Sequence, residues 1–139
     1  MNTAAVRVGR LLEIRVASGL RSAEDVDAHF VSIAQALESV PAGQRHVTVA
    51  DWRTCPVMSP EAAQRFGQCI AQYNARTERS AALANQEAPV TVLQFMRVIR
   101  EAGLPDRKLF FSEPELESWV GEVLTEAERE RLREFLAES

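Results

Sequence analysis

The sequence predicts an α/β fold with a single mixed, mainly parallel sheet of about five strands. Short runs rich in Val, Ile and Leu alternate with amphipathic helical segments, and two such runs at the start of the chain are separated only by Gly9-Arg10. Alternating strands and helices require crossover connections and parallel pairing, whereas the opening hairpin adds one antiparallel pair. The chain has 139 residues, 46% of them hydrophobic, which is enough for one core. We therefore expect one domain over residues 1–139.

The first strands are expected at Ala4–Val8 and Leu11–Ala17. Glycine in the first position of a two-residue loop suits a type II′ hairpin turn, so these strands should pair antiparallel. Ser22 then caps a helix, with Asp25 in the position that the Glu of a capping box occupies. The apolar side chains of this helix fall at i, i+4, i+7 and i+11 and form one stripe: Val26, Phe30, Ile33 and Leu37.

A buried strand and a second helix follow the turn at Pro41-Ala42-Gly43. The strand is expected at Arg45–Asp51, and the helix opens at Ser59-Pro60. The buried face of this helix is expected to comprise Ala63, Phe66, Ile70 and Tyr73.

The second half of the chain repeats the alternation. Arg79–Ala84 is weak in strand propensity, and it is predicted to be a strand because helical segments flank it. Pro89 begins a helix that ends at Gly103, and Arg107–Phe111 is the fifth strand. The expected apolar stripe of this third helix is Val92, Phe95, Met96 and Ile99.

Two capping boxes predict the last two helices. Ser112 to Glu115 introduces the fourth helix, whose inward residues are expected to be Leu116, Trp119, Val120 and Val123. Thr125 to Glu128 starts an appended helix at about 125–137, outside a domain core at about 4–121. This last helix packs on its own domain or reaches a second copy, and the sequence supports both readings.

Composition excludes several classes of protein. The formal charge is −4 and the charges are interspersed, which argues against a nucleic-acid groove or a polybasic membrane surface. The two cysteines stand outside any CxxC or Cys/His ligand spacing, so we expect neither a metal nor a disulfide framework. No apolar run reaches the roughly 20 residues that span a bilayer, and a signal-peptide pattern is missing. We expect a cytoplasmic protein without a cofactor.

Three segments together resemble the STAS family, the domain shared by sulfate transporters and anti-sigma-factor antagonists. They are the hairpin before LLEIRV, VTVADWR followed by a helix that begins at a serine, and RKLFFSEPELESWV. The likeness reaches to about Gly121 and is strongest to the stand-alone bacterial branch of SpoIIAA-like proteins. It implies one sheet backed by helices and a regulatory role through protein–protein binding, with no catalysis.

Ser59 matches the position at which regulatory STAS members carry a phosphorylated serine. In those members the serine lies in an Asp-Ser-Ser-Gly-like motif and is modified by a partner kinase. Here the surrounding residues are Val57-Met58-Ser59-Pro60, without the aspartate, the paired serine or the glycine. Serine before proline is also an ordinary helix start, so Ser59 is a helix cap first and a candidate phosphorylation site by resemblance.

A surface for a partner or a ligand is expected around the second helix and the carboxyl edge of the sheet, where α/β sheets usually bind ligands. The candidate residues are Asp51, Trp52, Arg53, Ser59, Gln64, Arg65, Gln68, Asn85, Gln86 and Ser112. If they act together, they form a polar face around an aromatic anchor, Trp52. The alternative is structural: Asp51 pairs with Arg53 or caps loop amides, and Trp52 covers the sheet edge.

Three functions are compatible with these features. The first is a non-catalytic regulatory module of the partner-switching type, which binds a serine kinase, an anti-sigma-type regulator or a second copy of itself. The second is a small-ligand binding domain, since more distant relatives of this sheet bind lipids or nucleotides. The third is a thiol enzyme using Cys55, in the loop before the second helix, where a helix N-terminus can lower the pKa of a thiol.

Overall fold

The structure, a computed structural model, describes residues 2–138. Its sheet has the strand order β1-β2-β3-β4-β5, with an antiparallel first pair and parallel pairs thereafter. This confirms the predicted mixed, mainly parallel sheet. The strands are β1 (Thr3–Val6), β2 (Leu11–Arg15), β3 (His46–Asp51), β4 (Thr77–Leu83) and β5 (Arg107–Phe110).

Four of the five helices begin at a hydroxyl side chain that caps them. Ser22, Ser59, Ser112 and Thr125 each accept a hydrogen bond from the backbone amide three residues later. The helices are α1 (Ala23–Ala36), α2 (Pro60–Ala71), α3 (Pro89–Ala102), α4 (Glu113–Gly121) and α5 (Glu126–Ala137). Short 3₁₀ turns, Leu37–Ser39 and Asn74–Arg76, follow α1 and α2. Local capping chemistry therefore sets most of the helix starts.

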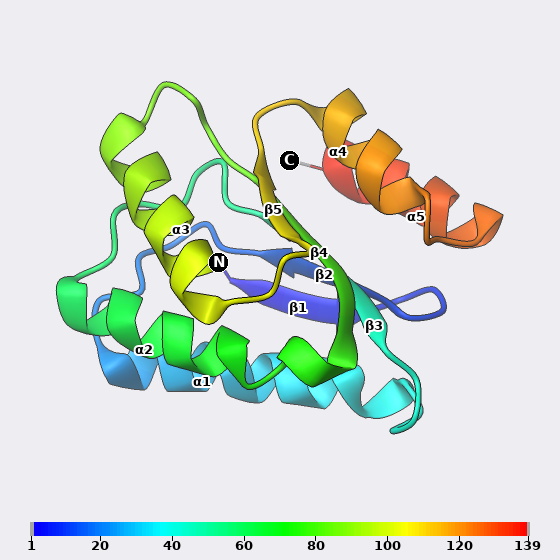
Figure 1. Cartoon of the computed structure of the whole chain (residues 1–139), viewed down its shortest axis with the longest axis horizontal. Helices are drawn as coiled ribbons and strands as arrows, with labels where there is room; N and C mark the ends of the chain where they lie inside the picture. Colours follow the sequence, from blue (N-terminus) through cyan, green and yellow to red (C-terminus); the bar gives the residue numbers. More distant parts are fainter. Residues whose placement is uncertain (1, 139) are drawn as a thin grey trace.

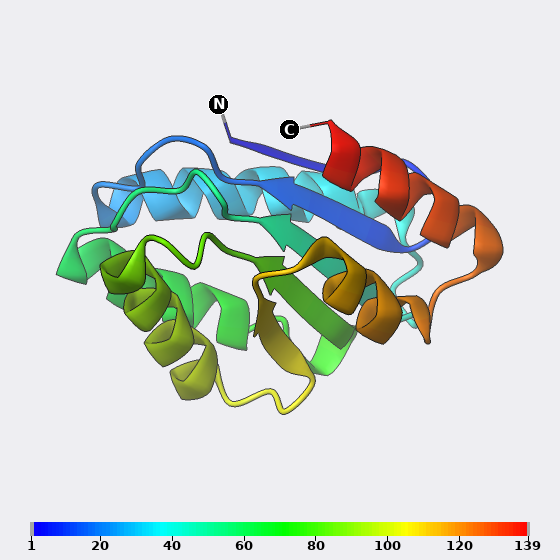
Figure 2. The same cartoon turned by 90° about the horizontal axis from the view of Figure 1, so that it is seen from above.

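Helices cover both faces of the sheet (Figure 1). Each parallel strand lies beside the one before it, and right-handed crossovers that progress in one direction place α1, α2 and α3 on the same face. The opposite face would be bare without α4 and α5, which lie next to each other on it (Figure 2). Leu11, Val47 and Val49 face α4 and α5, whereas Leu12 and Ala50 face α1 to α3.

The opening turn is where the sequence predicts it, but both strands of the hairpin are shorter than expected. The amide of Leu11 donates to the carbonyl of Val8 at 3.2 Å, and Gly9 has φ +57°, so the turn is centred on Gly9-Arg10 as expected. β1, however, stops at Val6 instead of Val8, and β2 starts at Leu11 as predicted but stops at Arg15 instead of Ala17. The amide of Arg10 donates to Glu128 Oε2 at 2.8 Å, and its carbonyl accepts from the amide of Val47 at 3.1 Å.

The predicted apolar stripe of α3 was wrong at one position. Met96 is half exposed, and Val98 is buried together with Phe95 and Ala102. The 3.6-residue period separates neighbours by about 100°, so Met96 lies well off a face centred on Phe95 and Val98. The exposure of Met96 matters for function because it places an apolar side chain on the surface.

Candidate functional site

The end of β3 carries a buried ion pair. Asp51 accepts hydrogen bonds from Arg53 Nε and Nη2, both at 3.0 Å, and Arg15 Nε lies 3.5 Å from Asp51 Oδ2. Burial alone would raise the pKa of Asp51, but the hydrogen bonds and charge of Arg53 outweigh burial and hold the pKa below its usual value. The carboxylate is therefore ionised and fully engaged.

Arg53 also ties the carboxyl edge of the sheet to both helices of the far face. Its Nη2 donates to the carbonyl of Leu136 at 3.2 Å, and its Nη1 lies 3.6 Å from Glu113 Oε1. Leu136 belongs to α5 and Glu113 opens α4. These contacts hold the sheet edge and the two helices together. They agree with the structural alternative, in which Asp51 pairs with Arg53.

Trp52 lies inside the protein, 7% exposed. Its ring centroid is 4.4 Å from that of Phe95 and 5.7 Å from that of Phe66. Side chains alternate along a strand, so Trp52 points the same way as Ala50, into the core under α1 to α3. This corrects the expectation of an exposed aromatic anchor.

The ends of three neighbouring strands do lie side by side at the carboxyl edge. The amide of Trp52 donates to the carbonyl of Leu83 at 2.8 Å, and the amide of Ala84 donates to that of Phe110 at 2.9 Å. Asn85, Gln86 and Ser112 follow directly in the chain. Asn85 Oδ1 accepts from the amide of Glu87, and Ser112 caps α4, whereas Gln86 is exposed. Two of these three side chains thus satisfy local backbone groups.

Ser59 has two hydrogen-bond partners. Its Oγ accepts from the amide of Ala62 at 3.1 Å and donates to the carbonyl of Arg21 at 2.9 Å. The first bond caps α2, and the second ties α2 to the loop before α1. The hydroxyl is half-buried in this role.

The polar residues expected on α2 divide between two sides of the helix. Arg65 Nε donates to Asp27 Oδ1 of α1 at 2.6 Å, and Arg65 Nη1 to Gln68 Oε1 at 3.4 Å. Gln64 instead lines a groove of about 710 Å³ between α2 and α3. The candidate residues therefore do not form one continuous site.

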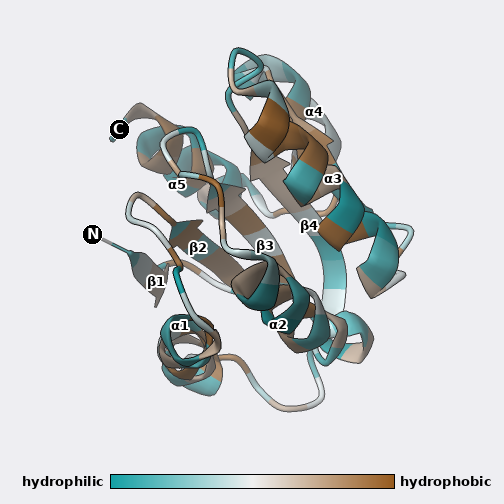
Figure 3. Cartoon of the chain, turned by 90° about the vertical axis from the view of Figure 1, so that its left-hand side faces the viewer, coloured by the Kyte–Doolittle hydropathy of each residue, from teal (hydrophilic) through white to brown (hydrophobic). Residues whose placement is uncertain are grey.

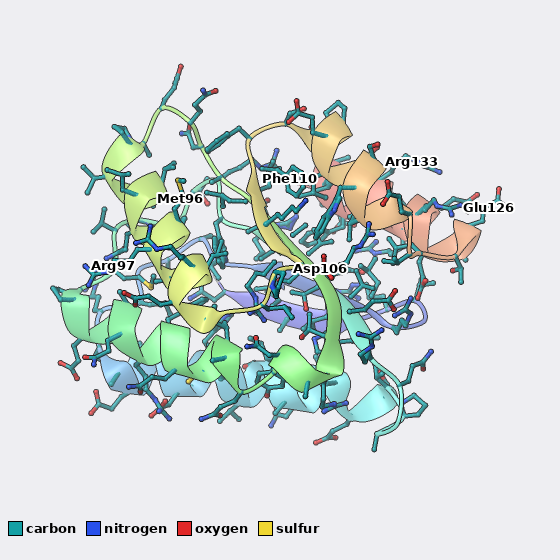
Figure 4. The ribbon with its side chains drawn as sticks, viewed as in Figure 1. Met96, Arg97, Asp106, Phe110, Glu126 and Arg133 are labelled. Carbon is teal, nitrogen blue, oxygen red and sulfur yellow. The ribbon has the colours of Figure 1, made fainter. Side chains whose placement is uncertain are left out.

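An apolar surface lies beside that groove. Val90 and Leu93 on α3 are 66% and 67% exposed, and Val57 in the loop before α2 is also exposed. Met96 is also exposed, but it lies on the other side of α3, beside Lys108 and Leu109 of β5. The amide side chain of Gln94 bonds both the amide and the carbonyl of Met58, at 2.8 and 2.9 Å, which fixes this loop against α3. Figure 3 shows apolar segments on α3, and Figure 4 marks Met96 and Arg97 on the same helix. We call this surface, Val57, Pro60, Gln64, Val90 and Leu93, the α2–α3 face.

A second feature, the inner cavity, lies between the sheet and helices α1 to α3. It has a volume of about 50 Å³ and a mainly apolar lining that includes Ile33, Phe66 and Ile70. Three basic side chains also line it: His29, His46 and Arg107. None of the three was among the candidate site residues predicted from the sequence. Alternation along the strands does place two of them on the inward face: His46 with Thr48 and Ala50, and Arg107 with Leu109.

Both histidines are held neutral by their surroundings. Burial lowers the pKa of His29, and burial together with the positive charges of Arg76, Arg107 and Arg10 lowers the pKa of His46 to about 4. Within residues 2–138, His29 Nε2 and His46 Nδ1 are buried and have no hydrogen-bond partner. His46 Nε2 lies 3.4 Å from Thr77 Oγ1.

Comparison with known proteins identifies the fold. No family model matches the chain, and neither does any curated protein. Among solved structures, it is similar to an uncharacterised protein of the DUF3478 family from Shewanella loihica PV-4, described as having a SpoIIAA-like fold. The two share 15% identity with a TM-score of 0.60, over 86% of this chain and 95% of the other. This chain has a SpoIIAA-like fold.

The loop before α2 in this SpoIIAA-like fold is ill suited to thiol chemistry. Cys55 is buried, and burial raises the pKa of its thiol to about 11, so the thiol stays protonated at neutral pH. Its Sγ lies 3.4 Å from the carbonyl of Pro56. Among residues 2–138, no group of three or more His, Cys, Asp or Glu side chains is placed to hold a metal ion, and no helix is long and apolar enough to cross a membrane.

Proposed function

We propose that this chain is a non-catalytic regulatory module that binds a protein partner through the α2–α3 face. The observation that carries the proposal is the cluster of exposed apolar side chains on that face. Three of the six large apolar side chains that are exposed in residues 2–138 belong to it: Val57, Val90 and Leu93. Apolar side chains gathered around a groove, rather than scattered singly, mark interaction surfaces.

The charges around the α2–α3 face favour a protein over a nucleic acid or an anionic membrane. Arg97 Nε lies 3.0 Å from Glu101 Oε1, so one of the two arginines of α3 is paired within the helix. Glu61 and Gln64 lie on the α2 side. An apolar centre with a mixed polar rim is the ordinary composition of a protein–protein interface. The resemblance to STAS proteins suggests a serine kinase or an anti-sigma-type regulator as the partner.

The chemistry of the buried groups supports a non-catalytic role. The Cys55 thiol is protonated, and the Asp51 carboxylate is saturated by arginines. Neither group is available as a nucleophile or a general base.

Co-purification from the native host with matched variants tests this proposal. Leu93→Asp introduces a charge at the centre of the α2–α3 face, while Val31→Asp does the same at an exposed valine on α1. We expect one protein to be recovered with wild type and with Val31→Asp, and to be lost with Leu93→Asp, because a buried unpaired charge opposes binding. Equal recovery with both variants would exclude this face, and binding to anionic vesicles without a protein partner would contradict the function itself.

A second candidate function, binding of a small ligand, is favoured by the inner cavity. A volume of about 50 Å³ is too small for a nucleotide, since an apolar cavity of about 150 Å³ holds one benzene. It suits a small, mainly apolar molecule. A thermal-shift screen of small apolar compounds tests this candidate, because a ligand at 100 times its dissociation constant adds about 2.7 kcal/mol of stability.

A further inference from the structure

Arg107 is a buried cation whose partners are neutral. It is 8% exposed and opens β5. Its Nη1 donates to Asn74 Oδ1 at 2.7 Å and its Nη2 to the carbonyl of Ile70 at 3.4 Å. Within residues 2–138 no carboxylate pairs with Arg107 and none lines the inner cavity. Buried arginines normally face a carboxylate or a phosphate because an uncompensated charge is costly in a low-dielectric interior.

Along the strands, the lining of the inner cavity is polar where the strands begin and apolar where β3 ends. Arg107, Thr77 and His46 are the first residues of their strands, whereas Trp52 follows the last residue of β3. His46, Thr48, Ala50 and Trp52 point to the same side of β3, a distance of about 20 Å along the strand. Along β3 the lining thus changes from His46 and Thr48 to Trp52. Two side chains outside the strands do not follow this order, because Tyr73 lies near His46 and His29 lies near Phe66.

Two buried ring nitrogens lack a partner in the same lining. His29 Nε2 and His46 Nδ1 have no hydrogen bond within residues 2–138, although both histidines are more than nine-tenths buried. An imidazole nitrogen donates or accepts according to its tautomer, so each can serve a bound polar group. Buried polar groups normally have hydrogen-bond partners. A buried nitrogen without a partner in the protein is therefore a site where a ligand or a water can bind.

We propose that the inner cavity binds a small carboxylate with a short apolar chain, whose head group pairs with Arg107. The planar guanidinium matches a carboxylate in a two-bond geometry, and the hydroxyls of Thr48 and Ser80 lie in the same lining. The chain of the ligand extends toward Trp52 and Phe66. This inference rests on the second candidate function and names its ligand class.

The volume limits the length of the chain. About 50 Å³ is several times the 10–15 Å³ that one water occupies by the same measure. The cavity is still well below the size that accepts an aromatic ring. Butyrate is therefore a suitable probe, and butyramide is its uncharged counterpart of nearly the same shape.

An NMR titration with butyrate and with butyramide tests the inference. We expect butyrate to shift the signals of cavity residues such as Ile33, His46 and Trp52 to saturation, and to bind at least about tenfold more tightly than butyramide, because a charge-assisted pair is lost with the amide. Arg107→Gln should remove this preference. Arg100→Gln, at an exposed arginine on α3, should keep it.

The outcomes test two claims separately: that the ligand is a carboxylate, and that the inner cavity binds a small ligand. Equal binding of butyrate and butyramide, or an unchanged preference in Arg107→Gln, would overturn the carboxylate assignment while leaving a small-ligand site intact. No shift of cavity signals with either probe, or shifts confined to residues outside the cavity, would overturn the assignment and the second candidate function together. If Arg107→Gln does not fold, the comparison of the two probes on wild type decides the question.

Discussion

Ser59 illustrates how one side chain supports the fold in two ways. It caps α2 through the amide of Ala62 and holds the loop at Arg21 through its hydroxyl proton. Phosphorylation would remove that proton and force the carbonyl of Arg21 away. The cap thus accounts for a serine at this position without any modification.

Replacing Ser59 should therefore cost stability. Ser59→Ala is expected to lower the free energy of unfolding by about 1 kcal/mol, because it removes the cap of α2. Ser59→Asp should retain the cap but lose the bond to Arg21. Chemical denaturation measures both. Ser32→Ala, at an exposed serine inside α1, is the control and should change stability little; an Ser59→Ala variant as stable as this control would refute the capping role.

The helix α5 is an integral layer of the protein. Glu13 on β2, 3% exposed, accepts hydrogen bonds from Arg131 Nε and Nη2 at 2.7 and 2.8 Å. Glu128 of α5 accepts from the amides of Arg10 and Thr125, both at 2.8 Å. With Leu132, Phe135 and Leu136 these contacts cover the face of the sheet that the crossover helices leave bare.

Breaking the pair between β2 and α5 should be strongly destabilising. Arg131→Met leaves Glu13 buried without its main partner, and we expect a loss of about 3–5 kcal/mol in the free energy of unfolding. The double variant Glu13→Leu/Arg131→Met should recover most of that loss, because it also removes the buried carboxylate that Arg131→Met leaves unpaired. Arg133→Met, at an exposed position of the same helix (Figure 4), is the control. A loss for Arg131→Met no larger than that of the control would contradict the account.

The stability of the whole molecule should depend on His46 below neutral pH. Its folded-state pKa is lowered to about 4 from 6.5, so the unfolded state takes up a proton first as the pH falls. Above pH 6.5 His46 does not lower the free energy of unfolding. Between about pH 6.5 and 4 its titration lowers that free energy, by about 3 kcal/mol at most. Urea unfolding of wild type and His46→Phe across this range measures the difference. Parallel curves for the two proteins would show that His46 does not titrate as described.

Local signals explain how much of the fold could be predicted. Alternating runs and caps such as Ser22, Ser59 and Ser112 depend on residues a few positions apart, and they located every strand and most helix starts. The pairs Glu13–Arg131 and Arg107–Asn74 join residues 118 and 33 positions apart. Local sequence patterns do not predict contacts between residues so far apart in the chain. The burial of Trp52 and the exposure of Met96 depend on which side of an element meets the core, so the candidate site was predicted less well than the fold.

The α2–α3 face can be tested most directly by measuring the affinity of one partner for two variants. Once a protein is recovered with the wild-type chain, calorimetry with that purified protein compares Leu93→Asp with Val31→Asp. We expect Leu93→Asp to weaken binding by at least about 2 kcal/mol, about thirtyfold, because the exposed apolar centre of an interface dominates its energy, while Val31→Asp binds as wild type does. An unchanged affinity for Leu93→Asp would contradict a partner site on this face.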